Sequence, residues 1–421
     1  MGRFRKWGFV AETNTCHAKT RTLLLSLMLS KHLHPSHLGR ILLILLISGC
    51  QETTDQSKEA APPFVLKSLE LSQKKANGEL DWDLKSPMAY YHLSNKTVSA
   101  RDPEGILYKS NKPSFEISAN IATVINDGEI VILEGNVKLQ QVTGEKVLIT
   151  GDRLQWTPKD SIMSIDHNPQ AFNKNTRIKS NKAEFHQSTH ELIFTGPTQL
   201  DRWKKQRHEN QNPTIVITGG NSTWNLDNGS FKAAGPIDGK RYVEAIENPH
   251  ELTATRLEGN SKKGYLDLIS PVVLMIPDKQ AILEAKTTRW HFNNDMIISN
   301  RPFSAKQESS TYRGDAFRVD LDKQIVEITK NCKLSQPDEK LTANKCSLNW
   351  DTDEVLATGD VLLKRKANNQ TTRSDQLDGR IGSEGTVVFS SPGSTVKSQL
   401  TIRENEDKNT SKARQSSPIE F

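Results

Sequence analysis

The histidines and carboxylates of this sequence are the first residues to test for catalytic or metal chemistry. His186 and His190 lie four residues apart, as two metal ligands can, but the intervening Gln-Ser-Thr favours a turn. The sequence contains no Gly-x-Ser-x-Gly elbow, P-loop, His-Glu-x-x-His or calcium-binding loop. Acidic residues are abundant, yet no pair stands out for glycoside hydrolysis. We therefore expect no metal, no cofactor and no enzymatic activity, with a polysaccharide-active enzyme kept as an alternative.

Cys50 is the strongest candidate for a covalent modification. Arg40 is followed by seven apolar residues, 41–47, and then by Ser-Gly and Cys50. A basic residue, a short apolar run and small residues are the parts of a secretory signal, and this run is too short to cross a bilayer. Its end resembles a bacterial lipobox. We therefore expect residues 1–49 to be a signal peptide and acylated Cys50 to hold the mature protein on a membrane.

Composition excludes several classes of protein. Only 35% of the 421 residues are hydrophobic and 25% are charged, which excludes a multi-span membrane protein. Residues 1–49 carry seven Lys or Arg and one Glu, so the rest of the chain is neutral and we expect no nucleic-acid partner. Four cysteines without a Cys-x-x-Cys pair indicate neither a disulfide scaffold nor a zinc ribbon.

From Leu66 onward the hydrophobicity alternates with a period of two residues, as in Leu80, Trp82 and Leu84. Turn signals interrupt this pattern; they are Asn77-Gly78, Asn126-Asp127-Gly128, Thr143-Gly144, Asp227-Asn228-Gly229 and Gln336-Pro337-Asp338. Helical stripes are almost absent, so no helices are available to connect parallel strands. The pattern predicts an all-β, antiparallel architecture.

A nine-residue unit with a central Gly recurs along the chain. Clear copies cover 131–139 and 355–363, and weaker ones 192–200, 231–237 and 326–334. A Gly inside a strand indicates a bend or bulge, so each copy is predicted to be a long strand that folds over while keeping one face inside. The residues expected to face inward are Val131, Leu133, Val137, Leu139, Leu154, Trp156, Leu192 and Phe194, and those expected to face outward are Glu134, Asn136 and Lys138.

Cys332 and Cys346 form a possible disulfide. Cys332 takes the place of Val137 in the repeat, and Cys346 alternates with Leu348, so both should face inward. The turn at 336–339 would place them on adjacent antiparallel strands, where a bond depends on the register. Two buried free thiols acting as small apolar side chains are the alternative.

The segments are predicted as follows: a signal peptide at 1–49, a flexible tether at 50–63, a first β half at 64–203, a connecting β region at 204–263, a second β half at 264–402, and a disordered tail at 403–421. The second half is suggested because residues 78–87 are echoed by residues 264–271. We expect both halves to share one continuous sheet.

Five motifs occur in a characteristic order: Leu80-Asp-Trp-Asp-Leu-Lys-Ser-Pro-Met-Ala-Tyr-Tyr91, Pro103-Glu-Gly-Ile-Leu-Tyr108, Ala119-Asn-Ile-Ala122, Glu134-Gly-Asn-Val137 and Gly151-Asp-Arg-Leu-Gln-Trp156. With these motifs, residues 69–203 resemble LptC, the periplasmic component of lipopolysaccharide export, within the wider OstA-like family. Residues 264–363 resemble it weakly. Ordinary LptC members are about half as long and hold the membrane with a transmembrane helix, so this sequence resembles a long form.

The resemblance implies a twisted, V-shaped open β-jellyroll whose apolar interior binds lipid A acyl chains at the inward residues. It implies a periplasmic, membrane-anchored protein that transfers lipopolysaccharide toward the outer membrane. The implied partners are the inner-membrane ABC export complex and a periplasmic OstA-like chaperone, both bound by edge-strand pairing. A β-rich surface lipoprotein or adhesin and a polysaccharide-active β-helix enzyme are the alternatives, and parallel strands would favour the enzyme.

Overall fold

The period-two segments form strands in the computed structural model, which describes residues 62–206, 211–244, 247–366, 369–380 and 386–400. The expected signal peptide, Cys50, nearly all of the tether and the tail at 403–421 lie outside the described residues. The described residues form 36 strands and three short 3-10 turns at Asn126–Gly128, Pro158–Asp160 and Pro277–Lys279. Among these residues no helix is long and apolar enough to span a membrane.

Every strand pairing is antiparallel, from β1 with β2 at one end to β34 with β36 at the other. The prediction of an antiparallel, all-β fold is therefore confirmed, and the parallel β-helix alternative is wrong. The strands belong to one hydrogen-bonded network with two arms, arranged as a jellyroll-like trough.

Long strands at both ends of the network contribute to both arms. They are β1 (Phe64–Lys74), β2 (Leu80–His92), β7 (Ile130–Gln141), β8 (Leu148–Thr157), β33 (Glu354–Arg365) and β34 (Gln370–Arg380). Between and beside them, short strands pair within one arm only.

The first arm contains β3 (Thr97–Arg101), β6 (Ile121–Ile125), β9 (Ile162–His167), β12 (Lys182–His186), β13 (Glu191–Thr195), β16 (Ser222–Asn225), β17 (Ser230–Ala233), β20 (Arg256–Asn260), β21 (Tyr265–Ile269), β24 (Thr288–His291), β25 (Met296–Ser299), β28 (Ala316–Asp320), β29 (Ile325–Lys330), β32 (Lys345–Asn349) and β35 (Val387–Ser390).

The second arm contains β4 (Glu104–Lys109), β5 (Lys112–Ser118), β10 (Gln170–Phe172), β11 (Thr176–Lys179), β14 (Thr198–Arg202), β15 (Ile215–Gly219), β18 (Ile237–Arg241), β19 (His250–Ala254), β22 (Val272–Ile276), β23 (Ala281–Ala285), β26 (Phe303–Gln307), β27 (Ser310–Gly314), β30 (Cys332–Ser335), β31 (Glu339–Ala343) and β36 (Lys397–Gln399).

The predicted fold-over at the repeat Gly occurs where a long strand passes from one arm to the other. In β7 the register shifts between Glu134 and Val137, and Gly135 takes a φ of 73°. A Cβ on Gly135 would lie 2.7 Å from the amide nitrogen of Asn120, so glycine is required here. The same arrangement recurs in β33, where Gly359 lies against Asn344. These two copies therefore bend without turning their inward face outward. For the copies at 192–200, 231–237 and 326–334 the prediction of one long strand is wrong, because each is divided into two strands on different arms: β13 and β14, β17 and β18, and β29 and β30.

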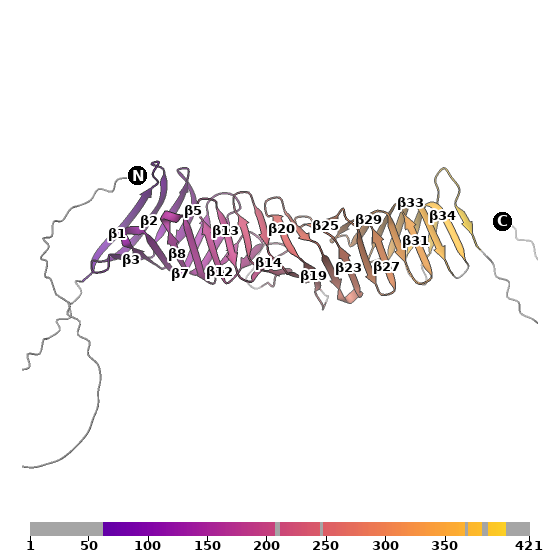
Figure 1. The fold of residues 1–421 in the computed structure, drawn as a ribbon, viewed down its shortest axis with the longest axis horizontal. Helices are drawn as coiled ribbons and strands as arrows, with labels where there is room; N and C mark the ends of the chain where they lie inside the picture. The colour runs from indigo at the N-terminus through magenta and orange to yellow at the C-terminus, as the bar shows by residue number, and fades with distance from the viewer. Residues whose placement is uncertain (1–61, 207–210, 245–246, 367–368, 381–385, 401–421) are drawn as a thin grey trace, which may run out of the picture. The chain divides into compact units, whose positions relative to one another are not determined.

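The ladder continues through the region between the two predicted halves. On the second arm β14 pairs with β15, β15 with β18, and β18 with β19. On the first arm β13 pairs with β16, β16 with β17, and β17 with β20. Taken by itself, this β-region carries its strands in succession along one axis, from β1 to β34 (Figure 1). With about twenty steps of ~4.8 Å between neighbouring strands, the stack extends roughly 95 Å.

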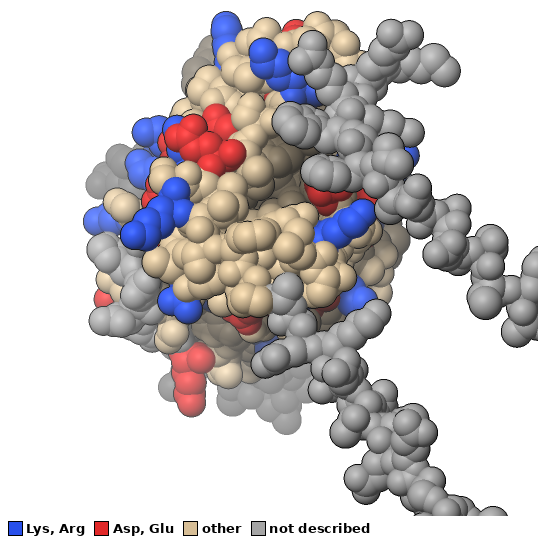
Figure 2. All heavy atoms as spheres, turned by 90° about the vertical axis from the view of Figure 1, so that its left-hand side faces the viewer, with Lys and Arg blue, Asp and Glu red and all other residues tan. Residues whose placement is uncertain are grey.

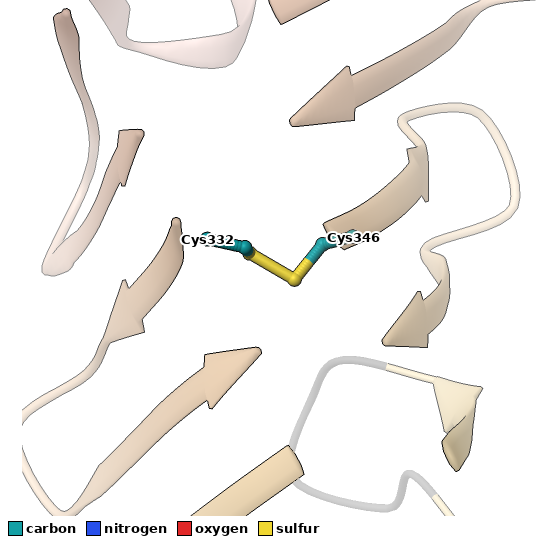
Figure 3. The surroundings of a disulfide bond; sticks show 2 residues. All are labelled: Cys332 and Cys346. Atoms are coloured by element: carbon teal, nitrogen blue, oxygen red, sulfur yellow. A yellow bond between two sulfur atoms is a disulfide. The ribbon is translucent and has the colours of Figure 1, made fainter. Parts of the chain in front are cut away.

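The two predicted disulfide cysteines lie on opposite arms. Cys332 begins β30 and is paired with Ala343 of β31 in the second arm, whereas Cys346 lies in β32 of the first arm. The expectation of adjacent strands is wrong, because the chain passes from the second arm to the first at Asn344, between β31 and β32. The line along which the two arms meet, where such crossings occur, is called the fold line below. Both side chains nevertheless point into the interior, and a disulfide joins them with 5.9 Å between the Cα atoms (Figure 3).

Candidate functional site

The apolar interior between the arms is the main candidate site, and the residues expected to face inward all lie in it. Their exposed fractions are between 0 and 2%; they are Val131, Leu133, Val137, Leu139, Leu154, Trp156, Leu192 and Phe194. Glu134, Asn136 and Lys138 are exposed on the opposite face of β7. In this part of the chain the inward face is a packed core rather than an open groove.

Aromatic side chains from the two arms fill that core. Trp82, on the second-arm half of β2, packs edge-on against Trp156 with ring centroids 5.1 Å apart. Phe115 of β5 meets Phe185 of β12 in the same way at 4.8 Å. Such pairs add to the free energy gained by burying the rings. They hold the two arms together through the region that ends near Leu192.

A polar cluster around the buried His190 joins the two arms at the outer side of this core. His190, at the β12–β13 turn, is 4% exposed, and its Nδ1 lies 2.7 Å from Oδ1 of Asp227 in the β16–β17 turn. Its Nε2 lies 3.1 Å from the hydroxyl of Ser114 on the second arm. Lys109 adds an ion pair of 2.6 Å to Asp227. The four side chains join the tips of three hairpins across the two arms.

Burial lowers the pKa of His190, and the opposing effect of Asp227 does not offset it. The imidazole is therefore neutral near pH 7, with one nitrogen free to donate to Asp227 and the other to accept from Ser114. Ser, His and Asp in series can also activate a nucleophile. Here Ser114 is 9% exposed and lines neither the cavity at Arg202 nor the one at Leu334, so the geometry fits a structural contact.

Two further contacts join the two arms nearby. Gln187 donates to the carboxylate of Asp81 at 3.3 Å, and burial raises the pKa of Asp81. Ser261 donates to Glu145 at 3.2 Å, joining the β20–β21 turn to the β7–β8 loop. The arms are thus connected at their tips as well as along the fold line.

The packed core that ends near Leu192 is called the sealed core below. Beyond it the interior contains an open cavity. A cavity of about 590 Å³ lies between the second-arm turns at 173–175 and 203–206 and the first-arm turns after β20 and β24. Its apolar lining is Ile178, Leu200, Trp224, Phe231, Leu266 and Phe292. Its basic lining is Lys174, Arg202, Lys204 and Lys205. This volume lies within the range of small-molecule binding sites.

Three tryptophans present unpartnered indole nitrogens inside the structure. The Nε1 atoms of Trp82, Trp156 and Trp290 are buried and have no hydrogen-bond partner among the residues that the structure describes. By contrast, Trp224 at the cavity donates to Ser261 at 3.2 Å. A buried donor without an acceptor costs free energy, so a guest carrying carbonyl or hydroxyl groups would be stabilised in this interior.

The β-region ends in strand edges that are unpaired within the described residues. β1 pairs only with β2 and exposes Phe64, Val65 and Leu66. Viewed from this end, the middle of the surface is mostly neither acidic nor basic, and charged side chains lie around it (Figure 2). At the other end β35 and β36 pair only with β34, and Val388 is 62% exposed. Both ends can therefore accept another strand.

The sequence did not indicate the cavity, because its residues come from β-turns and strands far apart in the chain. The run Arg202-Trp-Lys-Lys205 was the only local signal, as three cations beside an aromatic residue. The histidine pair expected to lie at a turn does so: His190 ends the turn that follows β12. No group of three or more His, Cys, Asp or Glu in the described ranges could hold a metal ion.

Comparison with known families agrees with this architecture. Residues 39–192 match the family described as "Lipopolysaccharide-assembly, LptC-related". No curated protein matches the chain significantly. The matched residues 39–192, called the family region below, end in β13. They contain the sealed core and the bend at Gly135, while most residues that line the cavity come after them. This match over residues 39–192 supports an LptC-type lipopolysaccharide-assembly protein.

Proposed function

We propose that this protein is a membrane-anchored, periplasmic component of lipopolysaccharide export. In this role it receives lipid A acyl chains between its two arms and transfers them along a bridge of proteins paired edge to edge. The observation that carries the proposal is the LptC-related match on a fold whose apolar side chains line one continuous interior. Each buried methylene group of a lipid gains about 0.8 kcal/mol, which such an interior supplies without a cofactor or a catalytic step.

The two free edges support the bridging role. An added strand would satisfy the unpaired backbone groups of β1 or of β35 and β36, and the exposed apolar residues at both ends would become buried. The inner-membrane ABC export complex and a periplasmic OstA-like chaperone are the proposed partners. A stack of roughly 95 Å would place these two partners far apart, with this chain as the connection between them.

The proposed membrane anchor is acylated Cys50, which lies outside the described residues. Two acyl chains provide stable attachment where one does not. Cys50→Ala should leave the protein unprocessed or released from the membrane. Mass spectrometry of the wild-type protein that finds an unmodified Cys50 thiol would contradict the anchor but not the role of the β-region.

Photo-crosslinking in intact cells tests the cargo. A photo-reactive residue at Val137 or Leu154 should capture lipopolysaccharide, and one at Glu134 or Lys138, on the outward face of the same strand pair, should not. Circular dichroism of each purified variant checks that the strands have formed. Equal capture at inward and outward positions would contradict the proposed interior path.

A further inference from the structure

The cavity that lies mostly beyond residue 192 contains a partly buried cation with no ion-pair partner among the described residues. The guanidinium of Arg202, at the end of β14, lies 4.2 Å from the ring centroid of Phe292, which belongs to the other arm. It donates to the side chains of Asn175 and Thr176 and to the backbone carbonyl of Phe292, each at 3.2 Å. All of these partners are neutral, and no carboxylate pairs with Arg202 in the part of the chain that the structure describes.

The guanidinium of Arg202 is partly removed from water. Burial lowers the pKa of its guanidinium, and the opposing effect of the Asp295 charge is smaller. A charge removed from water is stabilised when an opposite charge reaches it. The planar guanidinium matches the oxygens of a phosphate in a bidentate way, and its stacking on Phe292 fixes its orientation.

Further cations stand beside Arg202 around the same cavity. Lys174 and Lys205 form no ion pair with any described residue, whereas Lys204 is paired with Asp322 at 3.1 Å. Below them the lining is apolar and aromatic, with Trp224, Phe231 and Leu266. A basic rim above an apolar floor is complementary to an anionic amphiphile, whose charged head lies at the rim and whose acyl chains lie against the floor.

We propose that this cavity is a binding site for the phosphorylated headgroup of a glycolipid, with Arg202 as its main phosphate ligand and Lys174 and Lys205 as secondary ones. The inference deepens the proposed function and rests on it, because the cargo proposed above is such a glycolipid. It adds a fixed site roughly midway along the stack, at which the anionic head is held while acyl chains occupy the interior.

Binding of purified lipopolysaccharide to the full mature chain tests the site. The probes are bisphosphorylated lipopolysaccharide, the same preparation after enzymatic removal of its lipid A phosphates, and phosphatidylglycerol in the same detergent. The wild type should bind the phosphorylated form about tenfold more tightly than the dephosphorylated form, as a charge-assisted contact typically provides. Phosphatidylglycerol that binds as tightly as the phosphorylated form would overturn the assignment to a glycolipid.

Arg202→Met keeps an unbranched apolar side chain over Phe292 and should abolish the tenfold preference. Arg256→Met is the matched control, since Arg256 is exposed on β20, pairs only with Glu258 in the described residues and does not line the cavity. It should keep the preference. Retention of the preference in Arg202→Met would overturn the site.

A second variant avoids any effect of Arg202 on folding. Lys174→Gln with Lys205→Gln removes two cations that make no ion pair within the described residues, and it should reduce the preference about threefold. An unchanged preference would overturn the role of these lysines at the rim. If the wild type binds neither form of lipopolysaccharide, the proposed function itself fails. If it binds both forms equally, the cargo stands and only the phosphate site fails.

Discussion

The region matched by the LptC-related family and the region beyond it have the same strand pairing but differ in how their interiors are filled. Nearly all of the largest fully buried side chains lie before residue 195, among them Phe115, Trp156 and Phe194, and only Phe317 lies later. Beyond that point several large inward residues keep a small exposed fraction, as in Leu266 at 6% and Trp290 at 8%, although smaller ones such as Ile237 and Ile328 are fully buried. The same pattern of strand pairing thus supports both a fully packed core and a partly open interior.

The arms are also connected differently in the two regions. In the family region, aromatic pairs and the His190 cluster join the arms through noncovalent contacts at their tips. In the later region, the Cys332–Cys346 disulfide joins them near the fold line, and Phe303 packs on Phe317 across the interior at 4.8 Å. Noncovalent closure can separate and re-form, so a lipid could enter the sealed core only as those contacts break. The cavity at Arg202 needs no such step.

The largest expected difference between the two regions is the loss of unfolding free energy when one tryptophan in each is replaced by alanine. Trp156→Ala removes a fully buried indole from a core without space, and we expect it to lower the free energy of unfolding by about 3–5 kcal/mol. Trp290→Ala removes an indole that is 8% exposed and lies in the less completely filled interior, and the loss should be about half as large, because fewer contacts disappear.

Chemical denaturation followed by hydrogen exchange measures both variants, with β8 and β9 reporting on the first and β24 and β25 on the second. Local exchange is needed because a long ladder does not unfold as one cooperative unit. Equal losses at the two positions would contradict the difference in packing.

Removing the covalent connection should have the next largest effect, confined to the later region. The double variant Cys332→Ser and Cys346→Ser should lower the local stability of β29 to β33 by about 3 kcal/mol, the cost estimated for opening a loop of about 15 residues. Protection in β7 and β8 should not change.

Reduction of the wild type should reproduce the behaviour of the double serine variant and is its matched control. Titration of the denatured, non-reduced protein should find neither thiol reactive. Two reactive thiols would show that the arms of the later region are not covalently joined.

The sequence predicted the strands well because period-two alternation and turn residues are local signals. Asn77-Gly78, Thr143-Gly144 and Gln336-Pro337-Asp338 each connect antiparallel strands that pair with each other. The bend at Gly135 was predictable for the same reason, because a Gly within an alternating pattern has a local meaning. The inward face of β7 followed from the alternation alone.

The sequence could not predict which arm each short strand joins. The arm of a short strand depends on whether the chain crosses the fold line before it. These crossings occur at residues of different types, Gly196, Thr255 and Asn344. The alternation around Cys332 and Cys346 therefore predicts adjacent strands, because it carries no sign of the crossing between them. The same limitation concealed the cavity, since Arg202 and Phe292 are 90 residues apart and meet only through the pairing of the two arms.

The smallest expected effect is the change with pH in the local stability that the polar cluster around His190 gives to the family region. The folded state lowers the pKa of His190 below its ordinary value of 6.5, because burial disfavours the charged imidazole. The unfolded chain therefore binds a proton more readily than the folded one. The stability from neutral His190 is present above about pH 6.5 and is lost as the pH falls through the lowered pKa.

His190→Gln removes this titration and two hydrogen bonds, so at pH 7.5 it should cost about 1–2 kcal/mol of local stability. Between pH 7.5 and 5.5 the wild type should lose protection at the β12–β13 and β16–β17 turns, and the variant should lose much less. The pKa of Asp227 is lowered because hydrogen bonds from Lys109 and His190 outweigh the effect of its burial.

His250→Gln is the matched control for this last comparison. Burial also lowers the pKa of His250, but this residue lies on β19 of the second arm, away from the polar cluster around His190. Its variant should keep the pH response at the two turns and change only the exchange of β18 and β19. If His250→Gln flattens the response at the turns as much as His190→Gln does, the pH dependence belongs to the whole ladder. The contact between the arms at His190 would then not be a separate acid-sensitive feature of the family region.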